Sequence, residues 1–283
     1  MVRTDADGSS IWLVDTTRAV ANRFVAHPSV VAYPVWSPDG ETIAFSRAEH
    51  LGPYPVGSVL PLFRKRLTGG GAEQRLTGSP ATFHLGTDWS RDGRFLLFFD
   101  MSPPTMEDIW YLRVPPEGRV TGPAELKPYL RTTAREFNGR FSPEADPQAG
   151  PRWVAYQSDE SGRSEVYIDS FPMPHRPIRV STNGGWFPEW GRALGNGERE
   201  MYYVSPDYKL MVVTLYTKAD GLQPSVPQEL FPLPAEVTMW SPYQAAVDGQ
   251  RFLVRATDER EPPRPLTVIV NWPALLENKG GGQ

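Results

Sequence analysis

The sequence predicts an all-β protein built from repeated sheets, and three observations support this. A tight turn between two apolar strands occurs at residues 36–40 (WSPDG) and again at 89–93 (WSRDG). An Asp-Gly pair at such a tip is a strong signal for a β-hairpin. The hairpins recur at intervals of roughly 50 residues, which is the period of propeller blades, and no stretch of similar length has helical periodicity. We therefore expect a β-propeller of about six four-stranded antiparallel blades, five substantial and one partial at the N-terminus.

The composition agrees with a globular protein of this kind. Of the 283 residues, 40% are hydrophobic and 12% aromatic, and the 30 Pro and 25 Gly lie mainly between the apolar runs, where short strands need turns. The net charge of −4 argues against a broad affinity for nucleic acid or for anionic membranes. The absence of Cys removes disulfides, thiolate nucleophiles and Cys-based zinc sites.

Neither a membrane span nor a signal peptide is predicted in this chain. No segment approaches the roughly 18 consecutive apolar residues of a spanning helix, and residues 1–10 lack the features of a signal peptide. We expect no cofactor, no metal site, no nucleic-acid partner and no membrane insertion by this segment.

The N-terminal part is expected to form a partial blade and a complete blade. Strands at 11–15 and 23–26 have no hairpin ahead of them, so they are predicted to be the outer half of a blade at 9–28. The blade at 29–79 takes its strands from residues 33–36, 43–46, 59–66 and 74–77.

Four further blades are expected at 80–131, 132–183, 184–234 and 235–276. In the most regular of them Ile109 and Tyr111 alternate with Trp110 and Leu112, as a strand packed on both faces requires. The strands expected in the next two blades are 153–157, 165–169, 178–182, 187–190, 201–204, 209–216 and 228–231. The last blade is predicted from residues 243–247, 251–256 and 266–272, and the Gly-rich residues 277–283 are expected to be disordered. Residues 1–283 are thus predicted to be one domain.

Several segments resemble known repeats. WSPDG (36–40), WSRDG (89–93) and FSPEAD (141–146) resemble the TolB-type, or WD-like, β-propeller repeats of bacteria. That broad family is also similar to the propellers that precede the catalytic domains of prolyl oligopeptidase-type and tricorn proteases. A closer resemblance, to the C-terminal propeller of bacterial membrane-anchored serine/threonine protein kinases, is carried by residues 11–15, 87–98, 139–172, 180–190 and 265–276.

The resemblance implies a scaffold with a sensing or interaction role, joined to a kinase domain upstream in a longer protein, and an extracytoplasmic location. It does not transfer kinase activity, because the sequence has no Gly-rich phosphate loop, His-Arg-Asp or Asp-Phe-Gly motif. The sequence departs from the repeat pattern at 146–151, where the hairpin tip is longer, and at 191–194, where Ser-Pro is replaced. These departures leave the blade count and the closure of the ring open.

No catalytic residues are predicted. The sequence has no Gly-x-Ser-x-Gly elbow, and the histidines lack metal-ligand spacing; they are His27, His50, His84 and His175. Residues 5–8 (DADG) hint at a calcium loop but lack its later ligands, so a turn is the better interpretation. We interpret five tryptophans as packing between blades: Trp36, Trp89, Trp110, Trp153 and Trp190.

Binding is expected at loops. In a propeller, the loops that enter each inner strand and those that join the second and third strands gather on one face around the channel. Aromatic and Arg side chains are enriched at recognition hot spots. The candidates for ligand binding are Tyr33, His84, Arg135, Glu136, Asn138, Trp186, Trp240 and Tyr243, together with Phe187. The same side chains equally fit a structural role in filling the channel.

Three functional hypotheses stay open. The first is a non-catalytic propeller that binds a protein or small ligand as the sensor or scaffold of a bacterial signalling protein. The second is a propeller hydrolase or lyase that uses Glu136, Glu189 and His84, which must then share a pocket or lie within hydrogen-bond reach. The third is a fragment whose role depends on an upstream domain, which the adjoining coding sequence would reveal.

Overall fold

The computed structural model describes residues 1–5, 8–15, 17–49, 59–68, 71–78, 83–101, 107–115, 125–234, 242–246 and 248–254. Their regular secondary structure is β-strand apart from one 3-10 turn, η1 (Pro147–Ala149), which confirms the all-β prediction. The chain divides into two compact units. Unit 1 comprises Met1–Arg163 with Ile168–Pro177, and unit 2 comprises Ser164–Tyr167 with Ile178–Gln283.

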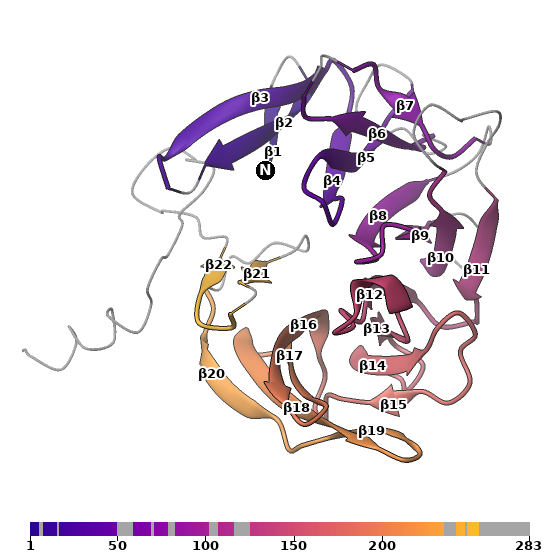
Figure 1. Cartoon of the computed structure of the whole chain (residues 1–283), viewed down its shortest axis with the longest axis vertical. Helices are drawn as coiled ribbons and strands as arrows, with labels where there is room; N and C mark the ends of the chain where they lie inside the picture. The colour runs from indigo at the N-terminus through magenta and orange to yellow at the C-terminus, as the bar shows by residue number, and fades with distance from the viewer. Residues whose placement is uncertain are drawn as a thin grey trace, which may run out of the picture. The chain divides into compact units, whose positions relative to one another are not determined.

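Unit 1 is a succession of antiparallel sheets that follow the order of the chain (Figure 1). The first has the strand order β1 (Val2–Asp5), β2 (Gly8–Asp15) and β3 (Val20–His27). The second has the order β4 (Val31–Trp36), β5 (Thr42–Arg47), β6 (Leu62–Arg66) and β7 (Gln74–Arg75). The third has the order β8 (His84–Trp89), β9 (Phe95–Asp100), β10 (Asp108–Arg113) and β11 (Leu126–Leu130).

A fourth sheet has the order β12 (Glu136–Phe141), β13 (Trp153–Ser158), β14 (Glu165–Ser170) and β15 (Ile178–Arg179). Unit 2 then contains β16 (Trp186–Gly195), β17 (Glu198–Val204), β18 (Lys209–Lys218), β19 (Gly221–Pro224) and β20 (Gln228–Pro232) in one sheet. A two-stranded sheet of β21 (Tyr243–Ala245) and β22 (Phe252–Val254) follows. Counted over the described residues there are six sheets, three of them four-stranded as predicted.

The first sheet differs from the predicted half-blade because it has a third strand, β1. Val2 lies opposite Ile11 of β2, and the N-terminal amino group donates to the Trp12 carbonyl at 2.9 Å. This strand was not predicted, because VRTD has only one apolar residue and strand signals rest on apolar alternation.

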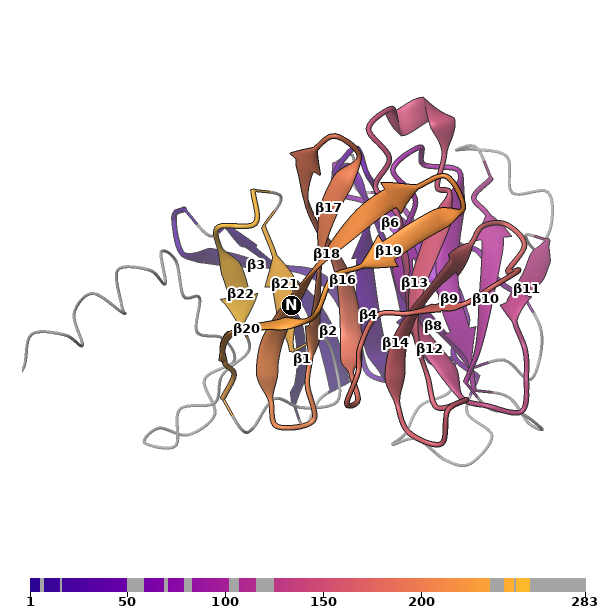
Figure 2. The ribbon, with the colours of Figure 1, turned by 90° about the horizontal axis from the view of Figure 1, so that it is seen from below.

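Strand β19 was also not predicted. β18 pairs with β20 through Lys209–Val212 and with β19 through Leu215–Lys218 (Figure 2). Gly221 and Pro224 bound β19, and both residue types are depleted in strands. Three residues, 225–227, interrupt what would otherwise be a single outer strand.

Apolar side chains fill the space between successive sheets within each unit. In unit 1, Ile11 and Val25 of the first sheet cluster with Ile43 and Phe45 of the second. In unit 2, Tyr202 and Leu210 of the five-stranded sheet cluster with Tyr243, Phe252 and Val254 of the two-stranded sheet. Burying each such side chain contributes about 1.5–3 kcal/mol.

The tryptophans do not all have the predicted packing role. Trp89 is 9% exposed and clusters with Ala44 and Leu62 of the preceding sheet, as expected. Trp36, at the equivalent end of β4, is 50% exposed.

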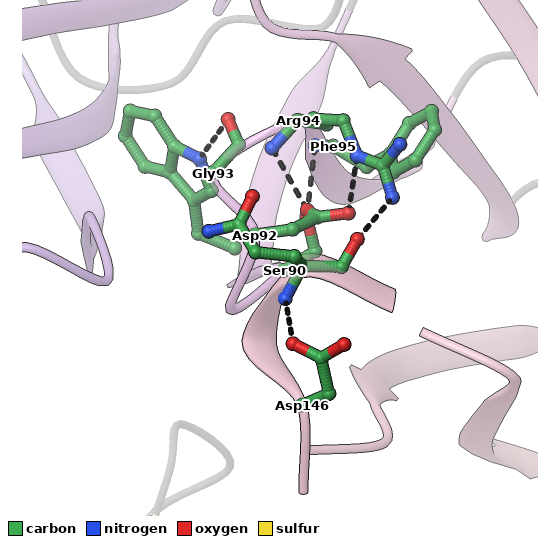
Figure 3. Close-up of polar contacts among 8 residues, drawn as sticks. Ser90, Asp92, Gly93, Arg94, Phe95 and Asp146 are labelled. Atoms are coloured by element: carbon green, nitrogen blue, oxygen red, sulfur yellow. Dashed lines mark hydrogen bonds and ion pairs between the residues drawn. The ribbon is translucent and has the colours of Figure 1, made fainter. Parts of the chain in front are cut away.

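The repeated hairpin tip is held by one Ser-x-Asp arrangement (Figure 3). Ser90 Oγ donates to Asp92 Oδ1 at 2.5 Å and accepts the N–H of Phe95, while the N–H of Arg94 donates to the same Asp92 oxygen. Gly93 has a φ of +74°, a conformation that L side chains rarely adopt. Ser37 and Asp39 repeat the arrangement before β5.

Candidate functional site

The first strand of each large sheet carries a β-bulge next to the loop that enters it. The register shifts at residues 32–35 of β4, 86–88 of β8, 137–140 of β12 and 186–189 of β16. Three of the bulged residues, Tyr33, Asn138 and Phe187, have positive φ angles of 53°, 54° and 55°. Non-Gly residues adopt such angles rarely, and bulges of this kind re-aim side chains. Three predicted binding residues therefore lie at equivalent strained positions.

In unit 1 the bulges bring aromatic side chains together. The ring of Tyr33 meets Phe99 of β9 edge-on, with ring centroids 5.9 Å apart, and the ring of Phe137 lies 6.2 Å from the same Phe99 ring. Asn138 donates from Nδ2 to Gln157 Oε1 at 3.2 Å. Aromatic side chains of β4 and β12 thus pack against the same residue, Phe99.

Arg135, in the loop before β12, makes polar contacts with Glu107 and Asp159. Its guanidinium makes a bidentate pair with Glu107, with Nη2 to Oε1 at 2.8 Å, and this bond raises the pKa of Arg135. Its backbone N–H donates to Asp159 at 2.9 Å, and the guanidinium carbon lies 5.9 Å from the Phe137 ring. Arg135 therefore cross-links three loops that precede or follow separate strands.

Glu136 lies beneath these loops and is only 2% exposed. Its Oε1 accepts from the Thr132 hydroxyl, and among the described residues its Oε2 has no hydrogen-bond partner. Burial raises the pKa of Glu136; the Thr132 hydrogen bonds oppose this, and the carboxylates of Asp108 and Glu160 add to it. The side chain thus favours the protonated form more than an exposed Glu does.

His84 is buried and does not present its ring to solvent. Nδ1 lies 3.1 Å from Thr77 Oγ1, and the ring packs on Phe98 at 4.6 Å. Burial lowers the pKa of His84 to about 4, against the opposing charge of Asp100. A neutral, enclosed imidazole of this kind does not fit the prediction that His84 contacts a ligand at the surface.

In unit 2 the predicted residues have mixed positions. Tyr243 is buried and its hydroxyl donates to the Phe187 carbonyl at 2.8 Å. Trp186 is half-buried, with its ring 6.0 Å from Tyr208. Trp240 lies outside the described residues.

Unit 2 contains a groove of about 730 Å³ that the sequence analysis missed. It is built by the β15–β16 loop, the β17–β18 turn and the residues that interrupt the outer strand. Its lining residues are Arg179, Val180, Thr182, Asn183, Gly184, Tyr203, Ser205, Pro206, Asp207, Lys209, Met211, Pro224, Ser225, Val226, Pro227 and Glu229. The first loop enters a first strand and the second joins the second and third strands, so both are of the kinds expected to bind.

The groove wall contains both charged and apolar side chains. Lys209 Nζ bonds to Glu229 at 2.8 Å and to Asp207 at 3.1 Å, which raises the pKa of Lys209. Arg179 is exposed, and no hydrogen bond or ion pair of its side chain is found within the described part of the chain. Val226 is 81% exposed. The groove therefore offers one unengaged cation beside an open apolar surface.

Polar contacts fix both loops of the groove. Glu165 accepts from the Ser181 hydroxyl and from the N–H of Gly184 at 3.0 Å. In the β17–β18 turn, Ser205 Oγ donates to Asp207 at 2.6 Å and accepts the N–H of Lys209 at 3.1 Å. This is the Ser-x-Asp arrangement of the hairpin tips, with Tyr208 at a φ of 57° in place of Gly. The sequence SPDY at residues 205–208 resembles the WSPDG tip and could have predicted this turn.

The three proposed catalytic side chains have separate partners. His84 bonds to Thr77 and Glu136 to Thr132, whereas Glu189 Oε2 accepts from Gln244 Nε2 and from the N–H of Ala245. Among the described residues, no group of three or more His, Asp or Glu side chains is placed to hold a metal ion. The described part of the chain likewise contains no helix that could span a membrane.

Solved structures similar to this chain are β-propellers. TolB from Acinetobacter baumannii aligns with a TM-score of 0.60 at 12% identity, over 89% of this chain and 55% of its own. The periplasmic gluconolactonase of Pseudomonas aeruginosa aligns at 0.55 and 15% identity, over 90% and 74%. A prolyl endopeptidase aligns at 0.50 and 16% identity, over 89% and 36%. No sequence-family model matches the chain, and no curated protein sequence matches it.

These similarities show that the chain has a TolB-like β-propeller fold, as predicted. The chain spans about half of the TolB structure and about a third of the endopeptidase. Because folds of this kind support both binding and hydrolysis, function must be argued from the site.

Proposed function

We propose that this chain is a non-catalytic β-propeller that binds a peptide segment or small ligand through the groove of unit 2. The observation that carries the proposal is the groove itself, because its two loops are of the kinds predicted to bind and its volume is in the range of ligand sites, roughly 300–1,000 Å³. Exposed Val226 and unengaged Arg179 favour a ligand with an apolar part and a carboxylate.

The experiment selects phage-displayed random dodecapeptides on the purified full chain and titrates the synthetic peptides that are enriched. We expect Arg179→Glu and Val226→Asp to weaken binding about tenfold or more. Leu194→Asp is the matched control, because Leu194 is exposed on unit 2 but does not line the groove. Peptides that bind the groove variants as tightly as the wild type would contradict the proposal.

We also propose that the chain works as the sensor module of a larger bacterial signalling protein of the serine/threonine kinase type, outside the cytoplasm. The support is the resemblance of residues 139–172 and 180–190 to kinase-linked propellers, together with similarity to a periplasmic enzyme. Sequencing the adjoining coding region tests this directly. We expect a kinase domain and a membrane span to be encoded in frame upstream. A separate gene that encodes a cytoplasmic protein would contradict the proposal.

A propeller hydrolase or lyase is the second candidate, because Glu136 is a buried carboxyl whose Oε2 has no hydrogen-bond partner among the described residues. Since Glu136, Glu189 and His84 have separate partners, Glu136 would have to act without the other two. The assay is turnover of chromogenic lactone, ester and peptide substrates by the wild type and by Glu136→Gln. Turnover that Glu136→Gln abolishes would support this candidate over the binding module.

A further inference from the structure

The loop of residues 170–177, which runs from the last residue of β14 to the start of β15, is anchored in unit 1 by an aromatic cluster. The ring of Phe171 lies 5.3 Å from Phe95, 5.0 Å from Tyr111, 6.0 Å from Tyr129 and 5.0 Å from Phe141. Three of these contacts are edge-to-face, the arrangement that aromatic pairs prefer. One side chain of the loop thus contacts rings from four strands.

Hydrogen bonds fix the backbone of the same loop. Asp169, which is buried, accepts at Oδ1 the N–H groups of Ser170, His175 and Arg176 at 2.7, 2.9 and 3.1 Å. Ser170 Oγ donates to the Met173 carbonyl at 2.6 Å. Both ends of the loop are therefore tied to one carboxylate.

Two further bonds join the loop to its surroundings in unit 1. The N–H of Phe171 donates to the Arg152 carbonyl at 2.8 Å, and the Tyr129 hydroxyl donates to the Ser170 carbonyl at 2.9 Å. Prolines at 172, 174 and 177 restrict the φ angles of the backbone between these anchors. The loop has little conformational freedom left to lose on binding.

The side chains at the tip are not used by the fold. Met173 is 77% exposed. His175 and Arg176 are exposed, and no side-chain hydrogen bond or ion pair of either is found within the described residues. A chain with a net charge of −4 thus presents, on one loop, an exposed apolar side chain and an exposed cation three residues apart.

We propose that the 170–177 loop of unit 1 is a docking element for a second protein. Met and Arg are enriched in protein interfaces, and a preordered loop reduces the entropy lost in docking. The partner surface that fits has an apolar pocket for Met173 bordered by Asp or Glu side chains for Arg176. A lipid surface fits less well, because each cation near an anionic membrane contributes only about 1 kcal/mol.

The test places a photoreactive benzoylphenylalanine at Met173 of the full chain, and at Val226 as control, and irradiates each with extract of the source cells. The protein captured at 173 but not at 226 is identified, purified and titrated with the chain. We expect Met173→Asp and Arg176→Glu each to weaken binding about tenfold or more, and Val226→Asp to leave it unchanged. Reversing the partner's facing carboxylate to Lys is expected to restore binding to Arg176→Glu.

Phe171→Ala tests whether the order of the loop matters, because the variant keeps Met173 and Arg176 but loses the aromatic anchor. It should weaken binding in a chain that still unfolds cooperatively. Absence of a protein captured at 173, or equal binding by wild type and tip variants, would overturn the proposal. So would tip-dependent binding to phosphatidylglycerol vesicles, or tip-dependent self-association in sedimentation.

Discussion

At the scale of single residues, two carboxylates have the same role in the two units. Asp88 precedes Trp89 on β8 and accepts the N–H of Phe141 on β12 at 2.7 Å. Glu189 precedes Trp190 on β16 and accepts the N–H of Ala245 on β21 at 3.0 Å. Each carboxylate ties the first strand of one sheet to the first strand of the next. Buried acceptors of this kind are costly to remove, because the N–H is left without a partner.

Asp88 should make folding stability depend on pH. Burial raises the pKa of Asp88 to about 6, although the Arg140 charge and two backbone N–H groups oppose the shift. Because the folded-state pKa is raised, the stability from this group is present below about pH 4 and is lost as pH rises through about 6. Asp88→Asn keeps an oxygen that can accept the N–H of Phe141 but does not titrate. The variant should therefore lack the decrease in unfolding free energy, on the order of 2 kcal/mol, that the wild type shows as pH rises. Urea unfolding of both proteins between about pH 4 and 7 measures it; parallel profiles would contradict the assignment.

Glu165 should control the shape of the groove. It is fully buried and accepts from Ser181 and Gly184, so Glu165→Leu leaves both donors unpaired and should destabilise the protein by about 2–4 kcal/mol. Glu165→Gln keeps one acceptor oxygen and should be milder. Thermal unfolding and titration with the selected peptide are the measurements. Equal effects of the two substitutions would count against the hydrogen-bond argument.

The sequence predicted less at this scale than at any other. Nothing in a single chain signals that bulky Tyr33 and Phe187 adopt positive φ, since the strain is imposed by the bulge and the neighbouring sheet. The pair of Arg135 and Glu107 joins distant parts of the chain, so it also has no local signal. His84, a binding candidate because of its place at an entering loop, is buried at the start of β8.

At the scale of elements, the Ser-x-Asp turn explains why the hairpins were predictable. Its hydrogen bonds lie within six residues, so the sequence WSRDG specifies them locally (Figure 3). The same reasoning applied to 205–208 would have found the groove turn. β1 and β19 were missed because their pairing depends on neighbours rather than on their own apolar pattern.

The Ser-x-Asp turns that contain Asp39 and Asp92 should contribute differently to the stability of the fold. The side chain of Asp92 is 1% exposed and pairs with Arg94 at 2.5 Å, whereas Asp39 is exposed. Asp92→Ala should therefore destabilise by about 2–3 kcal/mol and Asp39→Ala by about 1 kcal/mol. Urea midpoints of the two variants compare them under the same conditions. A larger effect at Asp39 would show that the ion pair adds nothing.

At the scale of the whole molecule, the fold is a series of sheets stabilised by apolar clusters between neighbours within each unit. The all-β class, the period and most strands were predictable, because repetition makes each hairpin evidence for the next. The division into two units and the groove were not, because both depend on how distant residues pack.

Substitution of Trp89 and of Trp36 should show how much the packing between sheets contributes to stability. Trp89→Ala should destabilise the protein by about 3–5 kcal/mol, since the indole is buried against the preceding sheet. Trp36→Ala should change stability by less than about 1 kcal/mol, because half of the side chain is exposed. Calorimetry of both variants decides this, and similar effects would contradict the packing described for Trp89.

The most direct test of binding through the groove is amide hydrogen exchange of the full chain with and without a saturating peptide from the display selection. If the peptide binds in the groove, exchange should slow in the β15–β16 loop, the β17–β18 turn and residues 224–229. Exchange that is unchanged there, or slowed only at the entering loops of unit 1, would contradict binding through the groove.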